Sequence, residues 1–377
     1  YQHAPAAPAL TPAELSTIAS LDSTPPQSPH VFQPVNRIEL LDSYVGLNLR
    51  NWQITFGPQS LSWGPGLGGS MLLSDNATPL TMLRIANATP FQMPSILRFL
   101  GLARLDQFVG RAQGRSFVPH PYIYGQKVSL KPWQYFEIGF ARTVTLGGRG
   151  GDTFNGRNFI KSFFGIEHLP LGVPGDSRSE VDWTFRVPGL KDFVVIYADM
   201  DADDDELPWV NPPRATYRPG LWITHFPSAP KLEFRFEATS TESPGFVSTG
   251  THIGNHGNLN YTHATYRDGY TNDGFLMANT VGRMGQAYQA WLTYTFSPAN
   301  TWQLSYKKSQ VDSEFIPGGG SWQDYGAAHE SHLRSGLYVK SALQYEHITR
   351  YPLLFTGPVH NLTASVEMGF SPGLLNH

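Results

Sequence analysis

The sequence predicts an all-β fold, a transmembrane antiparallel up-and-down β-barrel of about eighteen strands with long extracellular loops and few short helices. Three observations predict it. Apolar and polar residues alternate with a period of two in many segments. Short turns and long loops alternate along the chain. No apolar run of about 18 residues, the length that a transmembrane helix needs, is present.

The alternation is clearest where Val181, Trp183 and Phe185 interleave with Glu180 and Asp182. Each such segment is predicted as a strand with one apolar and one polar face. In a soluble sandwich the apolar face would form the core, whereas in a membrane barrel it contacts lipid and the polar face lines the lumen. The same pattern is found in segments 231–237, 288–296 and 362–371.

The connections favour the membrane barrel, because small periplasmic turns and large extracellular loops alternate in that fold. Roughly seventeen strands are predicted between Tyr44 and Ser371, and an even-stranded barrel needs one more, around Val31–Leu40. Closure is required since lipid offers no partner for an edge amide. Short turns are predicted at 131–133, 188–190, 226–230, 272–274, 297–300 and 335–336, and longer loops near 148–177, 202–213, 242–258, 311–324 and 351–359.

Two regions are predicted, an N-terminal segment of residues 1–30 and a barrel of residues 31–377. The first is rich in Pro, Ala and Ser. Its Thr11-Pro12-Ala13-Glu14 has capping-box spacing with proline at the first helical position, which favours a short periplasmic helix.

Composition excludes several classes of protein and site. Charged residues make up 15% of the chain, below the ~25% of soluble domains. The formal charge of −3 comes without a basic stripe, so nucleic acid is not an expected partner. The absence of cysteine excludes disulfides and thiolate metal sites. No cofactor is expected.

The segment WQITFGPQSLSWGPGLGGSMLLSDNATP, residues 52–79, is the most distinctive. It resembles the capsule assembly protein Wzi family, whose members carry a strand ending in Gly-x-Gln-Ser-Leu, a Trp-Gly-Pro-Gly turn, Gly-Gly-Ser and Asn-Ala-x-Pro. Family members usually have helices before this point, where this chain has a short Pro-rich lead. Further similar stretches follow in order at 122–143, 156–165, 197–208, 266–274 and 343–354.

The resemblance implies an eighteen-stranded barrel of the bacterial outer membrane that acts as a surface lectin and is not an enzyme. It would bind and retain capsular or exopolysaccharide at the cell surface, in contact with outer-membrane lipid including lipopolysaccharide, and we expect a monomer. The alternative is a porin-like channel for sugars or small solutes. A blocked lumen is expected for the lectin and an open one for the channel.

The distinctive segment contains a signature loop. Its glycines permit backbone angles that other residues avoid, and its proline fixes one angle. We expect a rigid loop folded into the barrel mouth, with direct ligand contact by Trp63 as the alternative. The loop residues are Trp63, Gly64, Pro65, Gly66, Gly69, Ser70 and Asn76.

Sugar binding requires planar aromatic rings for stacking, with carboxylates or amides nearby for hydroxyl groups. Two predicted extracellular loops, Asp201–Trp209 and Gly318–Tyr325, contain such mixtures. Solvated surface is the alternative interpretation of both. The candidate glycan-binding residues are Asp203, Asp205, Trp209, Trp322, Asp324 and Tyr325.

Neither a metal site nor a catalytic site is predicted. Asp199, Asp201 and Asp203 have the spacing that opens an EF-hand, but Asp204 and Val210 occupy its glycine and glutamate positions. No Gly-x-Ser-x-Gly elbow, HExxH or phosphate-binding loop occurs. Some carboxylates of the predicted strands could be paired for glycoside hydrolysis. The cations interleaved with them indicate a charge-balanced lumen wall instead. The carboxylates are Glu180, Asp182, Glu233 and Glu237, and the cations are Lys231, Arg235 and Arg186.

Overall fold

The computed structural model describes most of the chain from residue 41 onward. The described residues are 2–4, 35–37, 41–115, 117–164, 174–190, 193–203, 208–209, 215–242, 247–248, 251–252, 260–263, 265–313, 319–333, 336–350 and 358–370. The predicted helix near residues 11–14 lies outside them.

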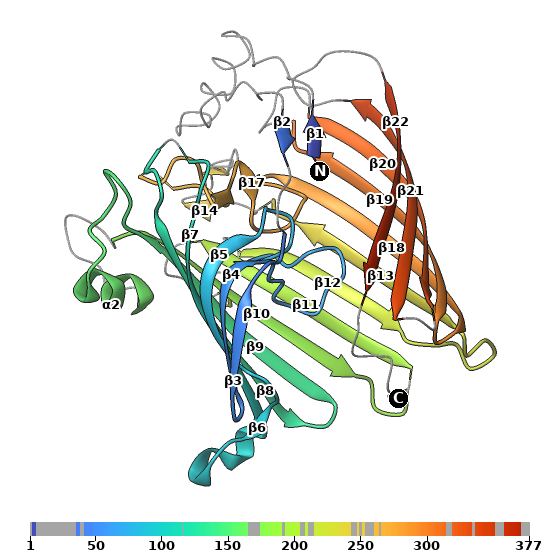
Figure 1. Cartoon of the computed structure of the whole chain (residues 1–377), viewed down its shortest axis with the longest axis horizontal. Helices are drawn as coiled ribbons and strands as arrows, with labels where there is room; N and C mark the ends of the chain where they lie inside the picture. The colour runs from blue at the N-terminus through green and yellow to red at the C-terminus, as the bar shows by residue number, and fades with distance from the viewer. Residues whose placement is uncertain are drawn as a thin grey trace.

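One antiparallel sheet dominates the structure, and its strands pair in chain order (Figure 1). The short β6 (Phe91–Gln92) pairs with β7 and brings the described strands of this sheet to sixteen. The remaining strands are β3 (Val45–Leu49), β4 (Trp52–Gln59), β5 (Leu80–Asn87), β7 (Leu102–Arg111), β8 (Tyr122–Trp133), β9 (Phe136–Leu146), β10 (Asp176–Arg186), β11 (Val194–Asp203), β12 (Ala215–Ile223), β13 (Leu232–Ser240), β18 (Gly285–Ser297), β19 (Asn300–Val311), β20 (Gly320–His332), β21 (Leu337–Arg350) and β22 (Val359–Phe370).

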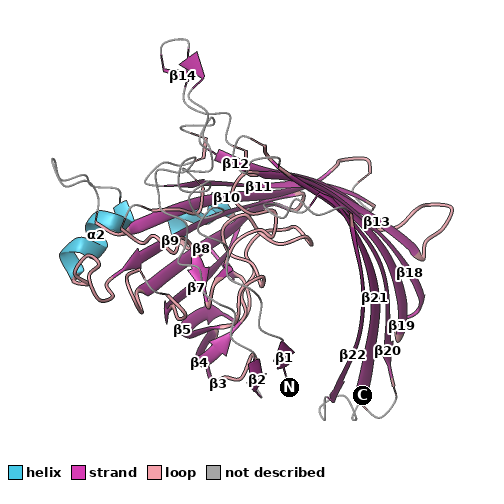
Figure 2. Cartoon of the chain, turned by 90° about the horizontal axis from the view of Figure 1, so that it is seen from above, coloured by secondary structure: helices cyan, strands magenta, loops and turns pink. Residues whose placement is uncertain are grey.

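The sheet curves through β10–β13, so that its end strands β3 and β22 lie on opposite sides of one interior (Figure 2). The predicted all-β, up-and-down antiparallel architecture is therefore confirmed. Within the described ranges, β2 (Val35–Arg37) pairs with β1 (Gln2–Ala4) in a separate two-stranded sheet, and the sixteen strands of the main sheet are close to the predicted number of about eighteen. The additional strand predicted around Val31–Leu40 corresponds to β2, which pairs with β1 rather than with β3 or β22 in the part of the chain described.

The connections differ in length at the two ends of the sheet, as predicted. One end carries short turns, such as those between β8 and β9 and between β18 and β19, together with η1 (Ser95–Leu100). The other end carries the long loops, including 60–79, 147–175, which contains α2 (Gly156–Phe164), and 241–284. The last of these loops contains β14 (Val247–Ser248), β15 (Thr251–His252), β16 (Thr271–Asn272) and β17 (Phe275–Leu276).

One predicted turn is misplaced. Asn272-Asp273-Gly274 does form a hairpin turn, between β16 and β17, but this hairpin belongs to the 241–284 loop and not to the short-turn end. Asn272 is 2% exposed and its Nδ2 donates to the carbonyl of Thr78, 3.0 Å away. Local turn chemistry predicts the hairpin, whereas contacts with a distant loop fix its position.

Two predicted loop segments are strands. Asp201 and Asp203 lie in β11, which pairs with β10 and β12, and Gly320–Tyr325 lie in β20, which pairs with β19 and β21. Polar and glycine-rich sequence suggested loops there. The inner face of a barrel strand is polar, however, so polarity does not distinguish such a strand from a loop.

In segments 288–296 and 362–371 the large apolar side chains point outward and are exposed, whereas Val181 of β10 is buried. Leu362, Val366 and Met368 of β22 are 66–70% exposed. Among the described residues no second sheet covers this surface, and no described helix is long and apolar enough to cross a membrane. An apolar outer face of this kind is what a barrel presents to lipid.

We expect Leu304→Arg to lower the free energy of unfolding in lipid vesicles by about 2–4 kcal/mol, because it puts a cation in the apolar belt. Leu304 is 56% exposed on β19. The matched control is Gln303→Arg, since adjacent residues of a strand face opposite sides. Denaturant titration in vesicles measures both, and equal losses would show that the outer face does not meet lipid.

Candidate functional site

The signature loop leaves the rim and folds into the interior of the barrel. Trp63 is 4% exposed, and Met71 and Leu72 are fully buried. The Trp63 ring packs on Phe108 of β7 with centroids 5.6 Å apart, and its Nε1 donates to Asp106 Oδ2 at 3.3 Å. The loop therefore lies inside the barrel, with the indole of Trp63 buried against Phe108.

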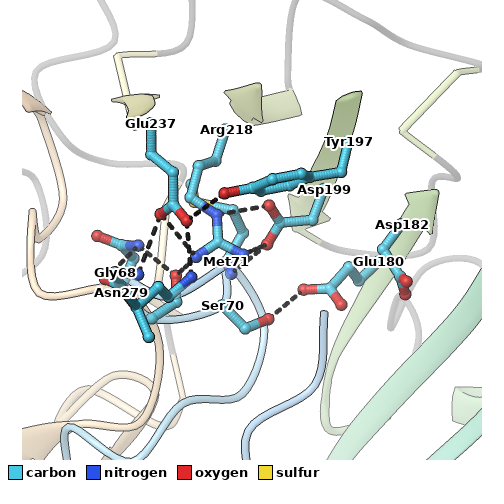
Figure 3. Close-up of polar contacts among 12 residues, drawn as sticks. Gly68, Ser70, Met71, Glu180, Asp182, Tyr197, Asp199, Arg218, Glu237 and Asn279 are labelled. Atoms are coloured by element: carbon cyan, nitrogen blue, oxygen red, sulfur yellow. Dashed lines mark hydrogen bonds and ion pairs between the residues drawn. The ribbon is translucent and has the colours of Figure 1, made fainter. Parts of the chain in front are cut away.

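Carboxylates of the barrel wall accept hydrogen bonds from the loop backbone (Figure 3). Glu237 of β13 accepts from the amides of Leu67 at 2.6 Å and Gly68 at 3.0 Å. Glu180 of β10 accepts from the Leu72 amide at 2.7 Å and from Ser70 Oγ at 2.8 Å. Bonds of this type to an ionised acceptor are roughly twice as strong as neutral ones.

Asp199 and Arg218 lie at the centre of the contact and are fully buried. Arg218 of β12 forms two bonds with Asp199 of β11, from Nε at 2.7 Å and from Nη2 at 2.8 Å. Asp199 also accepts from the Met71 amide at 2.9 Å. The Arg218 Nη1 donates to the carbonyl of Gly69 and lies 3.6 Å from Glu237 Oε2. The wall charges thus neutralise one another while they hold the loop.

Two signature glycines are required by this geometry. A Cβ on Gly66 would overlap the guanidinium of Arg218. Gly69 has a φ of +94°, a backbone conformation that side-chain-bearing residues rarely adopt. The loop therefore approaches the ionic cluster closely only because these positions carry no side chain.

A second ionic cluster lies between the wall and the 241–284 loop. Arg178 of β10 is paired with Asp201 and, at 3.0 Å, with Asp203. The Arg178 guanidinium lies over the ring of Tyr261 at 4.3 Å. Burial raises the pKa of the Tyr261 hydroxyl, which donates to the Met71 carbonyl at 2.7 Å. Tyr261 therefore joins the two loops to each other and to the wall.

Further hydrogen bonds connect the two inward loops directly. Asn76 Nδ2 donates to the Leu276 carbonyl at 2.7 Å, and Ser74 Oγ donates to the Ala278 carbonyl at 2.6 Å. Asn279 Nδ2 donates to the carbonyl of Gly69 at 2.7 Å. The signature residue Asn76 thus has a structural role as a link between the loops.

An apolar core lies inside the barrel, where the sequence predicted only a polar face. Leu72 and Trp63 of the loop cluster with Met82 of β5, Phe108 of β7 and Ile123 of β8. The prediction of an ionic inner face is wrong for this sector, because here the wall packs against a loop instead of water. Residues of the 241–284 loop complete the core, namely Tyr261, Tyr270, Met277 and Ala278.

A polar cavity of about 360 Å³ remains between the inward loops and strands β18–β21. Lys307 of β19 donates to Thr280 Oγ1 at 2.9 Å on one side of it. One carboxylate oxygen of Asp324, Oδ1, is buried with no hydrogen-bond partner among the described residues. The lining side chains include Asp75, Asn76, Gln289, Trp291, Lys307, Asp324 and Gln344. Amides, carboxylates and an indole edge are the groups that bind sugar hydroxyls and rings.

The predicted glycan residues of the first segment are separated by the fold. Asp203 is 4% exposed and paired with Arg178. Trp209 is 47% exposed and meets the Phe140 ring of β9 edge-on at 5.9 Å. Asp205 lies outside the described residues. Asp203 therefore belongs to the ionic cluster rather than to an exposed loop.

The candidates of the second segment lie on two faces of β20. Asp324 lines the cavity, and Trp322 shares its face because the two are separated by two positions on a strand. Tyr325 points outward, 47% exposed, with its ring 5.2 Å from Tyr306. Asp324 and Tyr325 therefore lie on opposite faces of β20, so one sugar unit cannot contact both.

The charge-balanced lumen wall was predicted, but with the wrong cations. Glu180, Asp182 and Glu237 do face inward, yet Asp182 pairs with Lys127 at 2.5 Å, Glu237 lies 3.6 Å from Arg218, and Glu180 bonds to the signature loop. The signal in the sequence was the charged residue at alternate positions from 176 to 182 in β10 and from 199 to 203 in β11. The acidic series of β11 is paired with arginine, and the described residues include no group of His, Cys, Asp or Glu suited to a metal ion.

Comparison with known proteins identifies similar sequences and structures. The family model described as capsule assembly protein Wzi matches residues 1–355. A Klebsiella pneumoniae protein described as an uncharacterized 55.8 kDa protein in the cps region is 27% identical over 176 residues. That match covers 45% of this chain and 34% of the other protein, about a third of its length.

The fold is similar to that of a solved structure, Wzi of Escherichia coli, described as an outer-membrane carbohydrate-binding β-barrel involved in group 1 capsule assembly. The TM-score is 0.71 at 18% identity, over 88% of this chain and 70% of that one. Pseudomonas aeruginosa OpdQ gives a TM-score of 0.45 at 11% identity, over 86% and 78% of the two chains.

We expect Arg218→Met to lower the free energy of unfolding by about 3–5 kcal/mol, because Asp199 would remain buried without its counter-charge. The double variant Arg218→Met with Asp199→Leu is expected to recover much of that loss. Arg186→Met, on the exposed end of β10, is the control and should change little. Denaturant titration in detergent tests this, and additive losses in the double variant would contradict the coupling.

Proposed function

Because the chain belongs to the capsule assembly protein Wzi family, we propose that it binds and retains capsular polysaccharide at the surface of the bacterial outer membrane. The observation that carries this proposal is the family match over residues 1–355. The exposed apolar outer face supports a location in the membrane. The protein would hold the glycan without catalysing a reaction on it, in contact with lipopolysaccharide and as a monomer.

The two inward loops favour retention over transport. A diffusion channel keeps a water-filled lumen, whereas here two long loops enter the interior and bind to the wall and to each other. Their anchors are buried ion pairs and charge-assisted hydrogen bonds, as at Arg218 and Glu237. Withdrawing a loop would remove its hydrogen bonds from these charges, and a charge that stays buried without its partner costs several kcal/mol.

The inner face of β20 is the part of the predicted glycan site that the geometry supports. Trp322 lies closer to the long-loop end than Asp324 does, on the same face, and Asp324 lines the polar cavity. An aromatic ring above a carboxylate is an arrangement suited to a pyranose ring with hydroxyl groups below it. We therefore assign Trp322 and Asp324 to glycan binding, while Trp209 and Asp205 remain predictions.

We expect Trp322→Ala and Asp324→Ala each to weaken binding of purified capsular polysaccharide by about tenfold, as for loss of about 1.5 kcal/mol. The control is Tyr325→Ala, adjacent in sequence but on the outer face, and it should bind normally. Surface-immobilised glycan with detergent-solubilised protein gives the affinities. If all three variants bind equally, the glycan site is not on β20.

A planar-bilayer measurement tests retention against transport. We expect the protein to give no stable channel current, and replacement of residues 61–73 by a short Gly-Ser linker to produce one, because that loop fills the interior. Steady conductance of the unaltered protein, at a level similar to the loop variant, would support a porin-like channel instead.

A further inference from the structure

The helix α2 lies against the outer face of the barrel, beside β8–β10 and toward the long-loop end (Figures 1 and 2). The rings of Phe159 and Phe163 pack edge-on against Tyr124 of β8 at 5.0 and 5.8 Å. Tyr124 points outward, because its neighbour Ile123 is fully buried in the interior core. The helix therefore packs on the surface that faces the membrane.

Polar contacts fix the helix in this position. Arg142 of β9 donates from Nη2 to the carbonyl of Ser162 at 2.9 Å and from Nη1 to Ser179 Oγ at 2.7 Å. Ser162 is itself a residue of α2 and is fully buried, on the side of the helix that faces the barrel. Because α2 has backbone and aromatic contacts with two strands, it is held in a fixed position on the outer surface of the barrel.

The position of α2 along the length of β8 and β9 matches the membrane interface. A transmembrane strand needs about 9–11 residues to cross the hydrocarbon, and β8 and β9 have 12 and 11 residues. Tyr124 is the third residue of β8 from the long-loop end, and Arg142 also lies in the half of β9 nearer that end. The contacts of α2 thus fall where hydrocarbon gives way to the headgroups of the outer leaflet.

The surface that α2 presents away from the barrel is apolar and basic. Ile160 and Phe164 are 52% and 69% exposed, and Phe154, before the helix, is 48% exposed while its ring packs on Tyr122. Arg157 and Lys161 are one turn apart, and the helix contains no acidic residue. Exposed aromatic and aliphatic side chains beside two neighbouring cations are typical of a helix that lies in the membrane interface.

We propose that α2 is an interfacial lipid-binding helix, in which Ile160, Phe164 and Phe154 enter the acyl boundary and Arg157 and Lys161 bind the phosphates of an anionic lipid. The occupant is a lipid because this patch continues the outward apolar face of the barrel, where Phe140 and Trp209 also meet. The inference does not depend on glycan binding.

The first arm of the test uses spin labels, which the chain accepts at single positions because it has no cysteine. Labels at Ile160→Cys and Phe164→Cys in vesicles should be accessible to oxygen and protected from a water-soluble nickel chelate, like a label at Leu304→Cys on the outer belt. A label at Gln344→Cys, which lines the cavity, is the aqueous control. Helix labels that behave like Gln344→Cys would overturn the proposal.

The second arm tests the cations with vesicles of phosphatidylcholine alone or mixed with lipid A. Affinity for lipid A should fall about fivefold for each cation removed in Arg157→Gln and Lys161→Gln, the equivalent of about 1 kcal/mol per charge. Arg157→Lys should retain it, and inorganic phosphate should not compete. Unchanged lipid A affinity in the double glutamine variant would overturn the phosphate assignment, and full competition by free phosphate would overturn the assignment of a lipid as the occupant. Circular dichroism verifies that each variant keeps its barrel.

Discussion

The structure depends on charges that lie inside the barrel and cannot be left without partners. Removing a carboxylate or a guanidinium from water costs several kcal/mol unless hydrogen bonds and an opposite charge replace the water. Asp199 and Arg218 meet this requirement with each other and with the backbone of the signature loop. Asp199 and Arg218 therefore each serve twice, since each neutralises the other and bonds to the loop that enters the interior.

The same constraint explains why the interior is divided into three parts. Where the loop backbone reaches the wall, the wall is ionic, as at Glu237 and Glu180. Where loop side chains reach it, the wall is apolar, as at Phe108 and Ile123. The remaining space near Asp324 is polar and forms the cavity. A loop of fixed conformation thus leaves a defined space suited to a sugar, which an open lumen would not.

The outer surface has the opposite requirement, namely apolar side chains, because it contacts the hydrocarbon of the membrane and, nearer its ends, the lipid headgroups. Apolar side chains such as Leu362 are exposed there without cost, since lipid replaces the protein core as their neighbour. Near the long-loop end, α2 adds aromatic and basic side chains to this surface. The glycan surface proposed for this protein lies on the inner face of the sheet, at β20, and the lipid surface lies on its outer face, beside β8–β10. Each can therefore be altered separately.

Strand periodicity and turn chemistry in the sequence determined the β-architecture, the long and short ends and the inward charges at Glu180 and Asp182, because alternation is a local property of the chain. Glycine spacing also indicated a rigid inward loop. The tertiary structure alone decided that Arg218 pairs with Asp199, that Asn272 lies within a loop and that Trp209 packs on Phe140. These pairs come from strands and loops whose approach depends on sheet curvature and loop entry. Neither is encoded by the residues of a single segment.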